Sequence, residues 1–183
     1  MAEIKDSVPL GVVLEKRAVE HRWIKHAWRP VAVIPGAPPL DPQGDWRSLR
    51  SGMDEDAAGA TAGPWEHFHA GTLACELFRK ETEGYKVNLS QEPPRVFVVL
   101  RSGTDLEVAH DWVPVHVTVC PYEAQDFLDS GEDLVEPVVM PPDLIAFVQA
   151  FVDRHHVDQP FYKRKRKPHD PRKVGFGKQP GHG

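Results

Sequence analysis

The residues best suited to chemistry are histidines and cysteines, and two of the histidines have a spacing that suits a shared ligand. His67 and His69 stand two residues apart at the start of a segment whose pattern predicts a β-strand. Side chains at positions i and i+2 of a strand point to the same face, so both imidazoles could reach one metal ion. Zinc needs at least three protein ligands, and Cys75, His116 or Cys120 would have to supply the third. None of these stands at a recognisable ligand spacing, so packing or hydrogen bonding of the two imidazoles is the favoured interpretation.

The two cysteines of the chain, Cys75 and Cys120, are too few for a disulfide scaffold or a four-cysteine zinc site. Either could act as a nucleophile only where a neighbouring histidine lowers its thiol pKa, and cysteines within strands are more typical of small apolar core residues. The chain contains no nucleophile elbow, no P-loop and no GxGxxG fingerprint. We therefore predict a protein that is not an enzyme and that uses no cofactor.

Two charged segments are candidates for binding a partner. Arg79, Lys80 and Glu81 precede Tyr85 at the expected tip of a hairpin. A tip of mixed charge is most simply a solvated turn, and the alternative is a recognition edge that pairs with the charges of a partner. The second segment is the basic end of the chain, whose candidate contacts are Phe161, Tyr162, Lys163, Arg164, Lys165, Arg166 and Lys167.

Charge is distributed unevenly along the chain. Residues 160–183 hold eight Lys/Arg and one Asp, a net charge of +7, so the first 159 residues must carry −12 to give the total of −5. Such a tail can bind nucleic acid, dock on an acidic protein surface (the body of this protein included) or serve as a solubilising end. An acidic body repels phosphate, so nucleic acid is disfavoured and an acidic protein surface is favoured.

The apolar pattern along the chain is mostly that of strands, followed by helices. Alternating or continuous apolar runs predict strands over residues 8–16, 30–34, 73–78, 85–90, 96–100 and 113–119. A stripe that includes Leu144, Val148 and Phe151 predicts a long helix packed on the sheet. A shorter helix is expected from Pro121 to about Asp129.

These elements predict one α+β domain over residues 1–159. Its sheet would be mostly antiparallel, with about six strands that could curl into a small open barrel, followed by two helices. Residues 35–63 are rich in Pro, Gly, Ala and Asp and are expected to form a long mobile loop, and residues 160–183 a basic, disordered tail. No apolar run approaches the ~18 residues of a membrane span and no secretory signal is recognisable, which predicts a cytoplasmic protein.

Several stretches together resemble a known bacterial family. They are VPLGVVLEKR, HAWRPVAVIPGAP, FHAGTLACELFRKETEGYKVNLS, RVFVVLR, PYEAQDFLDSGEDLVEPVVMP, FVDRHHV and PFYKRKRK. These stretches resemble a domain-of-unknown-function family that is encoded beside formate dehydrogenase subunits and their accessory proteins. The resemblance implies a cytoplasmic context close to molybdenum- or tungsten-dependent formate oxidation, and it supplies no catalytic motif. Residues 39–63 look longer than the usual connection of that family.

The residues and the resemblance favour an accessory or maturation protein, or a small subunit, that binds a formate dehydrogenase subunit or its assembly factor. One alternative is a carrier or enzyme for the molybdopterin cofactor, which would bind through the region of His67, His69 and Cys75 or through the basic tail. Another is a nucleic-acid-binding regulator that acts through that tail.

Overall fold

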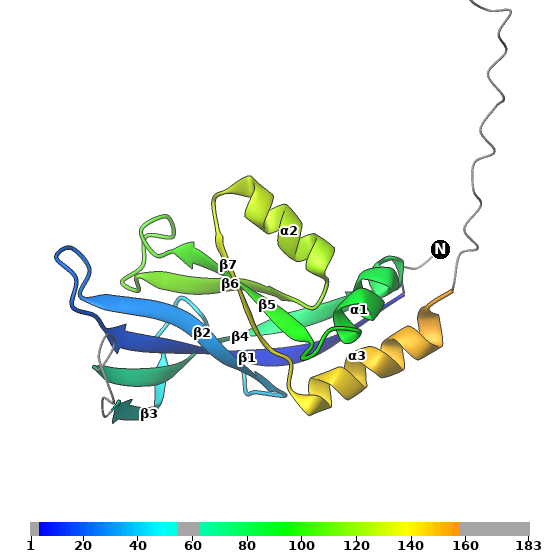
Figure 1. Ribbon diagram of the computed structural model, residues 1–183, viewed down its shortest axis with the longest axis horizontal. Coiled ribbons are helices and arrows are strands. Elements are labelled where there is room, and N and C mark those ends of the chain that lie inside the picture. The colour runs from blue at the N-terminus through cyan, green and yellow to red at the C-terminus, as the bar shows by residue number, and fades with distance from the viewer. Residues whose placement is uncertain (1–3, 55–62, 158–183) are drawn as a thin grey trace, which may run out of the picture.

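The computed structural model describes residues 4–54 and 63–157, which form two antiparallel sheets flanked by helices (Figure 1). The first sheet has the strand order β2-β1-β4-β3 and consists of β1 (Lys5–Ala18), β2 (His26–Pro35), β3 (Arg47–Met53) and β4 (Pro64–Phe78). The second has the order β6-β5-β7 and consists of β5 (Arg95–Ser102), β6 (Trp112–Thr118) and β7 (Leu134–Val139). The helices are α1 (Thr82–Leu89), which follows a 3-10 turn η1 (Arg79–Glu81), α2 (Pro121–Ser130) and α3 (Pro142–His155).

The α+β class predicted from the sequence is confirmed, and its details are only roughly right. Instead of one sheet of about six strands and two helices, the described residues form a four-stranded sheet, a three-stranded sheet and three α-helices. Both sheets keep open edges within these residues, so they do not close into a barrel. None of the described helices is long and apolar enough to cross a membrane.

The predicted strand over residues 85–90 is wrong, because this segment belongs to α1. The helix buries Thr82, Tyr85 and Asn88, which are spaced three apart and therefore share one helical face. Asn88 fixes the start of the next strand, since its side chain donates to the carbonyl of Arg95 and accepts the N–H of Arg95. The expected hairpin connection at residues 79–84 is likewise the entry to this helix.

Two strands lie where the sequence pattern indicated none. Strand β3 falls inside the predicted loop of residues 35–63, and six of its seven residues are exposed. Strand β7 is an edge strand interrupted by Pro137. Strand β3 is almost wholly exposed, and β7 buries Val135 and Val138, which are three residues apart, so neither segment shows the apolar alternation that identifies a strand. Residues 55–62, the rest of that predicted loop, lie outside the described residues.

The main core lies between the sheets and under α3. Leu10 and Leu14 of β1 and Val98 of β5 belong to one buried cluster with the α3 stripe, which consists of Leu144, Val148, Phe151 and Val152. Each of these large side chains contributes roughly 1.5–3 kcal/mol when buried. Helix α2 ends at Gly131, which has the left-handed φ of 69° that favours glycine at a helix end.

The two ends of the molecule differ. Helices α1 and α3 lie at one end, and the hairpin that joins β1 to β2 extends from the other, where it projects at the left of Figure 1. Strands β3 and β4 meet at this second end, because Gly52 pairs with Trp65 and Met53 with Pro64. This is the end of the molecule that carries the candidate site.

Candidate functional site

The candidate site is built around a buried carboxylate on β1. Glu15 is only 4% exposed, and the strand register places it opposite Arg29 of β2 and His67 of β4. Arg17 lies two residues further along β1 and shares the same strand face. Antiparallel pairing therefore brings Arg29 and His67 to the carboxylate of Glu15, and Arg17 reaches it along the same strand.

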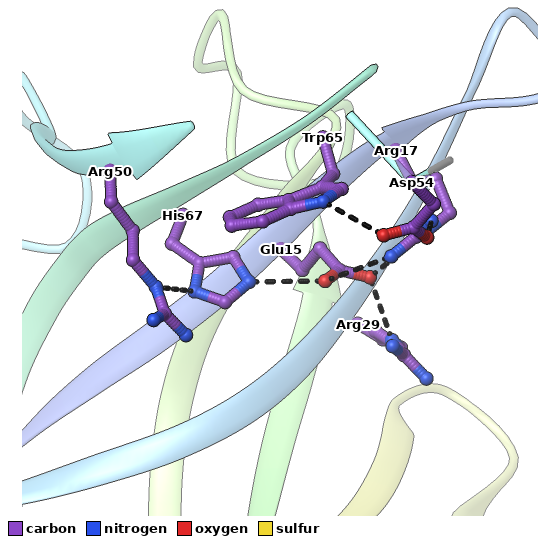
Figure 2. Close-up of polar contacts among 7 residues, drawn as sticks. All are labelled: Glu15, Arg17, Arg29, Arg50, Asp54, Trp65 and His67. Carbon is purple, nitrogen blue, oxygen red and sulfur yellow. Dashed lines mark hydrogen bonds and ion pairs between the residues drawn. The ribbon is translucent and has the colours of Figure 1, made fainter. Parts of the chain in front are cut away.

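All three side chains donate hydrogen bonds to Glu15. The Nε atoms of Arg17 and Arg29 donate to Oε1, at 3.1 and 3.0 Å, and His67 Nε2 contacts Oε2 at 3.0 Å (Figure 2). Burial alone would raise the pKa of Glu15, but the hydrogen bonds from Arg17, His67 and Arg29 outweigh it and lower the pKa to about 2. The carboxylate is therefore ionised throughout the physiological pH range.

The opposite nitrogen of the His67 ring is also engaged. Arg50 of β3 donates from Nε to His67 Nδ1 at 3.1 Å, so this nitrogen carries no proton and Nε2 is the donor to Glu15. Figure 2 shows the resulting row of side chains, which runs from Arg50 through His67 to Glu15. Glu15 and His67 together therefore connect all four strands of the first sheet.

A second carboxylate closes the arrangement. Asp54 pairs with Arg17 and accepts a hydrogen bond from Trp65 Nε1 at 3.1 Å. The Trp65 ring lies over His67, with ring centroids 4.6 Å apart, and the Arg50 guanidinium lies 5.5 Å from the Trp65 ring. We call this set the Glu15 network, which consists of Glu15, Arg17, Arg29, Arg50, Asp54, Trp65 and His67.

The chemistry open to the Glu15 network follows from these contacts. With His67 neutral, its three arginines and two carboxylates give a net charge of +1. A carboxylate with a pKa near 2 is a poor general base at neutral pH, and both nitrogens of His67 are engaged. The Arg29 side chain is 64% exposed, so it can contact an anion while its Nε holds Glu15. The arrangement suits the fixing of strands and the contact of an acidic group.

The structure separates the residues that the sequence proposed as metal ligands. The ring of His69 contacts Thr72 Oγ1 at 3.0 Å, whereas the ring of His67 lies between Glu15 and Arg50. Burial, followed by the charge of Arg47, lowers the pKa of His69. In residues 4–54 and 63–157, no group of three or more His, Cys, Asp or Glu side chains is placed to hold a metal ion.

Both cysteines are buried and free. Burial raises the pKa of Cys75 to about 12, and it also raises that of Cys120. A thiol with a raised pKa is a poor nucleophile at neutral pH. The interpretation of these cysteines as small core residues agrees with their burial.

The proposed partner-binding residues have mixed positions. Arg79 and Lys80 are exposed on η1 and Glu81 is half-buried. Tyr85 is fully buried, so the prediction that it contacts a partner at the surface is wrong. Its hydroxyl accepts the N–H of Phe78 and donates to Glu81, which makes it a core residue that ties η1 to β4. The remaining candidates, Phe161 to Lys167, lie outside the described residues.

Sequence reasoning missed most of the Glu15 network. One signal was present: Glu15 follows Val13 at the spacing of a single strand face, so a buried strand would bury its carboxylate and require partners. Arg50 and Asp54 gave no such signal, because they lie in or beside the exposed strand β3.

The comparison with known families can now be added. The family model described as a protein of unknown function (DUF3305) matches residues 9–166. The chain belongs to this family. The match spans the whole Glu15 network, and the family description gives neither an activity nor a partner, so it adds nothing to the link with formate dehydrogenase. No curated protein and no solved structure matches the chain.

Proposed function

We propose that the protein is a non-catalytic accessory protein that binds a formate dehydrogenase-type molybdoenzyme, during its maturation or as a small subunit. The observation that carries this proposal is the separation of charge. Residues 102–153, which include β6, α2, β7 and α3 as far as Asp153, contain eleven Asp/Glu and no Lys/Arg, whereas residues 15–29 contain five Lys/Arg and two Glu. Surfaces of opposite sign steer a protein toward a partner and orient it there.

The positions of the reactive side chains support a binding role. In the Glu15 network, the imidazole and the buried carboxylate hold four strands together, and the two thiols lie in the core. These groups act in building the scaffold, and the exposed charges remain for recognition.

The identity of the partner is proposed from the resemblance to the family encoded beside formate dehydrogenase. An accessory protein of that context would bind the apo-enzyme while the cofactor is inserted, or would remain bound afterwards. It would act in the compartment where the enzyme matures, which we propose to be the cytoplasm.

Deletion of the gene in the native host tests this function. We expect lower formate dehydrogenase abundance, less molybdenum or tungsten per enzyme and slower formate oxidation, with recovery when the full chain is supplied in trans. The proposal fails if abundance, metal content and activity are all unchanged in the deletion strain.

A second candidate, a carrier of the molybdopterin cofactor, is favoured by one surface feature. A hollow of about 410 Å³ lies at the hairpin end, lined in part by Trp65, Lys16 and His26. Its volume falls within the range of about 300–1,000 Å³ typical of ligand sites, and the Trp65 ring beside the ammonium group of Lys16 suits a phosphate-bearing pterin. A pterin nucleotide at 100 times its Kd would add about 2.7 kcal/mol of stability. The absence of a thermal shift would exclude this candidate.

A further inference from the structure

The hairpin that joins β1 to β2 exposes two large apolar side chains at its tip. Trp23 is 79% exposed and Ile24 is 53% exposed. Figure 1 shows that this hairpin extends beyond the rest of the first sheet. Single exposed apolar residues are common, but an adjacent Trp and Ile on a projecting tip form a patch of the kind that marks an interaction site.

The tip is held in a defined conformation. The Val19 N–H donates to the carbonyl of Lys25 at 3.2 Å, and the Trp23 N–H donates to His21 Nδ1 at 3.2 Å. The Arg22 guanidinium lies 4.9 Å from the centroid of the Trp23 ring. An ordered support lowers the entropy lost when a side chain docks.

The Glu15 network fixes the stem of this hairpin. Arg29 of β2 donates to Glu15 of β1, so the two strands are joined on one face just before they part. The last register pair is Ala18 with His26, directly beneath the tip. The Glu15 network therefore joins the two strands of the stem from which the tip with Trp23 projects.

The hairpin is a basic element on an acidic body. Residues 15–29 contain the acids Glu15 and Glu20 and five Lys/Arg, which are Lys16, Arg17, Arg22, Lys25 and Arg29. This gives residues 15–29 a net charge of +3, and since residues 1–159 carry −12, the remainder of that range carries −15. A partner with an acidic surface complements the charge of the hairpin, and the adjacent exposed Trp23 and Ile24 suit an apolar protein surface.

We infer that the hairpin tip is a docking element that inserts Trp23 into an apolar pocket on a partner protein, with Arg22 and Lys25 pairing with carboxylates at the rim. Tryptophan and arginine are the side chains most enriched at the energetic centres of protein interfaces. The inference rests on the proposed function, that the protein binds another protein, and adds which element docks and that the partner surface is acidic.

Site-specific photo-crosslinking in the native host tests this inference on the full chain. The variant Trp23→p-benzoylphenylalanine places the crosslinker at the tip, and Tyr122→p-benzoylphenylalanine is the control, because Tyr122 is also aromatic and 56% exposed but lies on α2. We expect an adduct with one protein from position 23 and none from position 122, with a crosslinked peptide rich in Asp and Glu.

Charge reversal adds a second readout. Arg22→Glu with Lys25→Glu should lower the adduct yield about tenfold, while the double reversal Lys5→Glu with Arg154→Glu, at exposed positions of β1 and α3, should leave it unchanged. A chain with Trp23→Ala should keep the wild-type melting temperature and bind the crosslinked protein roughly 30-fold more weakly. Melting temperatures of all variants show whether each one is folded.

The outcomes separate the inference from the proposed function. An adduct with a protein unrelated to formate dehydrogenase would leave the docking element standing and remove the proposed partner. A formate dehydrogenase subunit that binds the Trp23→Ala chain as tightly as the wild type would support the proposed partner and overturn the docking element. No adduct at position 23, an adduct with nucleic acid, or a yield unaffected by Arg22→Glu with Lys25→Glu would overturn the inference.

Discussion

Replacing Glu15 by glutamine tests the physical account of the site most sharply. Both carboxylate oxygens of Glu15 accept hydrogen bonds, Oε1 from Arg17 and Arg29 and Oε2 from His67. A glutamine side chain has one acceptor oxygen and one NH₂ group, so in either orientation its NH₂ faces an N–H donor. The substitution therefore removes the negative charge. It also leaves the glutamine NH₂ group facing at least one N–H donor of Arg17, Arg29 or His67, with no acceptor between them.

The magnitude follows from the pKa of Glu15. Its folded value of about 2 lies below the ordinary value of 4.5, a difference of about 2.5 pKa units, which corresponds to about 3 kcal/mol. Because the folded pKa is depressed, this contribution is fully present above pH 4.5 and is lost as the pH falls toward 2. We expect Glu15→Gln to lower the free energy of unfolding by about 3 kcal/mol at pH 7 and by about 1 kcal/mol at pH 3.

Urea unfolding of both proteins at pH 7 and pH 3 measures these differences. The matched control is Glu20→Gln, which makes the same chemical change at an exposed position of the same hairpin and should shift stability by no more than about 0.5 kcal/mol. A loss below about 1 kcal/mol at pH 7, or a loss of equal size at both pH values, would refute the role assigned to Glu15.

Three further predictions concern the core. Tyr85→Phe removes the hydroxyl that accepts the Phe78 N–H and should cost about 1–3 kcal/mol in urea unfolding, and a neutral result would show that this bond is unimportant. Phe151→Ala empties a fully buried site and should cost roughly 3–5 kcal/mol in the same assay, with a loss below about 1 kcal/mol contradicting its place in the core. Because Cys75 and Cys120 are buried with raised thiol pKa values, neither should react with a thiol reagent at pH 7 until the protein unfolds, and rapid labelling of the native chain would contradict their burial.

The elements predictable from the sequence are those that bury an apolar face. Strands β1, β2, β4, β5 and β6 and helices α2 and α3 each overlap a predicted segment, because their side chains follow the period of the element that packs on the core. Strand β3 and the edge strand β7 pack little or interrupt the pattern with proline, so local sequence carries no signal for them.

The error at α1 has a different cause. Over residues 85–90, apolar and polar residues alternate as they do in a strand, yet the segment buries Tyr85 and Asn88, which share a helical face. Gly84, Lys86 and Asn88 are residue types depleted in strands. Their presence argues against a strand even though apolar and polar residues alternate here. Apolar alternation over six residues is too short to separate the two periods.

The Glu15 network depends on pairing between distant parts of the chain. Glu15 and His67 are 52 residues apart, and only the β1–β4 register brings them opposite each other. Sequence spacing drew attention to His67 and His69 as a pair, whereas the decisive neighbour of His67 lies on another strand. The exposure of Trp23 likewise depends on how far the hairpin extends beyond the sheet.

The measurement that tests the central claim most directly is quantitative co-purification from the native host. Full chains with and without Trp23→Ala would be isolated under identical conditions, together with a chain ending at Gln159, and bound proteins would be quantified by mass spectrometry. The account predicts that a formate dehydrogenase subunit accompanies the full chain, is retained without residues 160–183 and is largely lost with Trp23→Ala. A full chain that brings down no formate dehydrogenase subunit or assembly factor would contradict it.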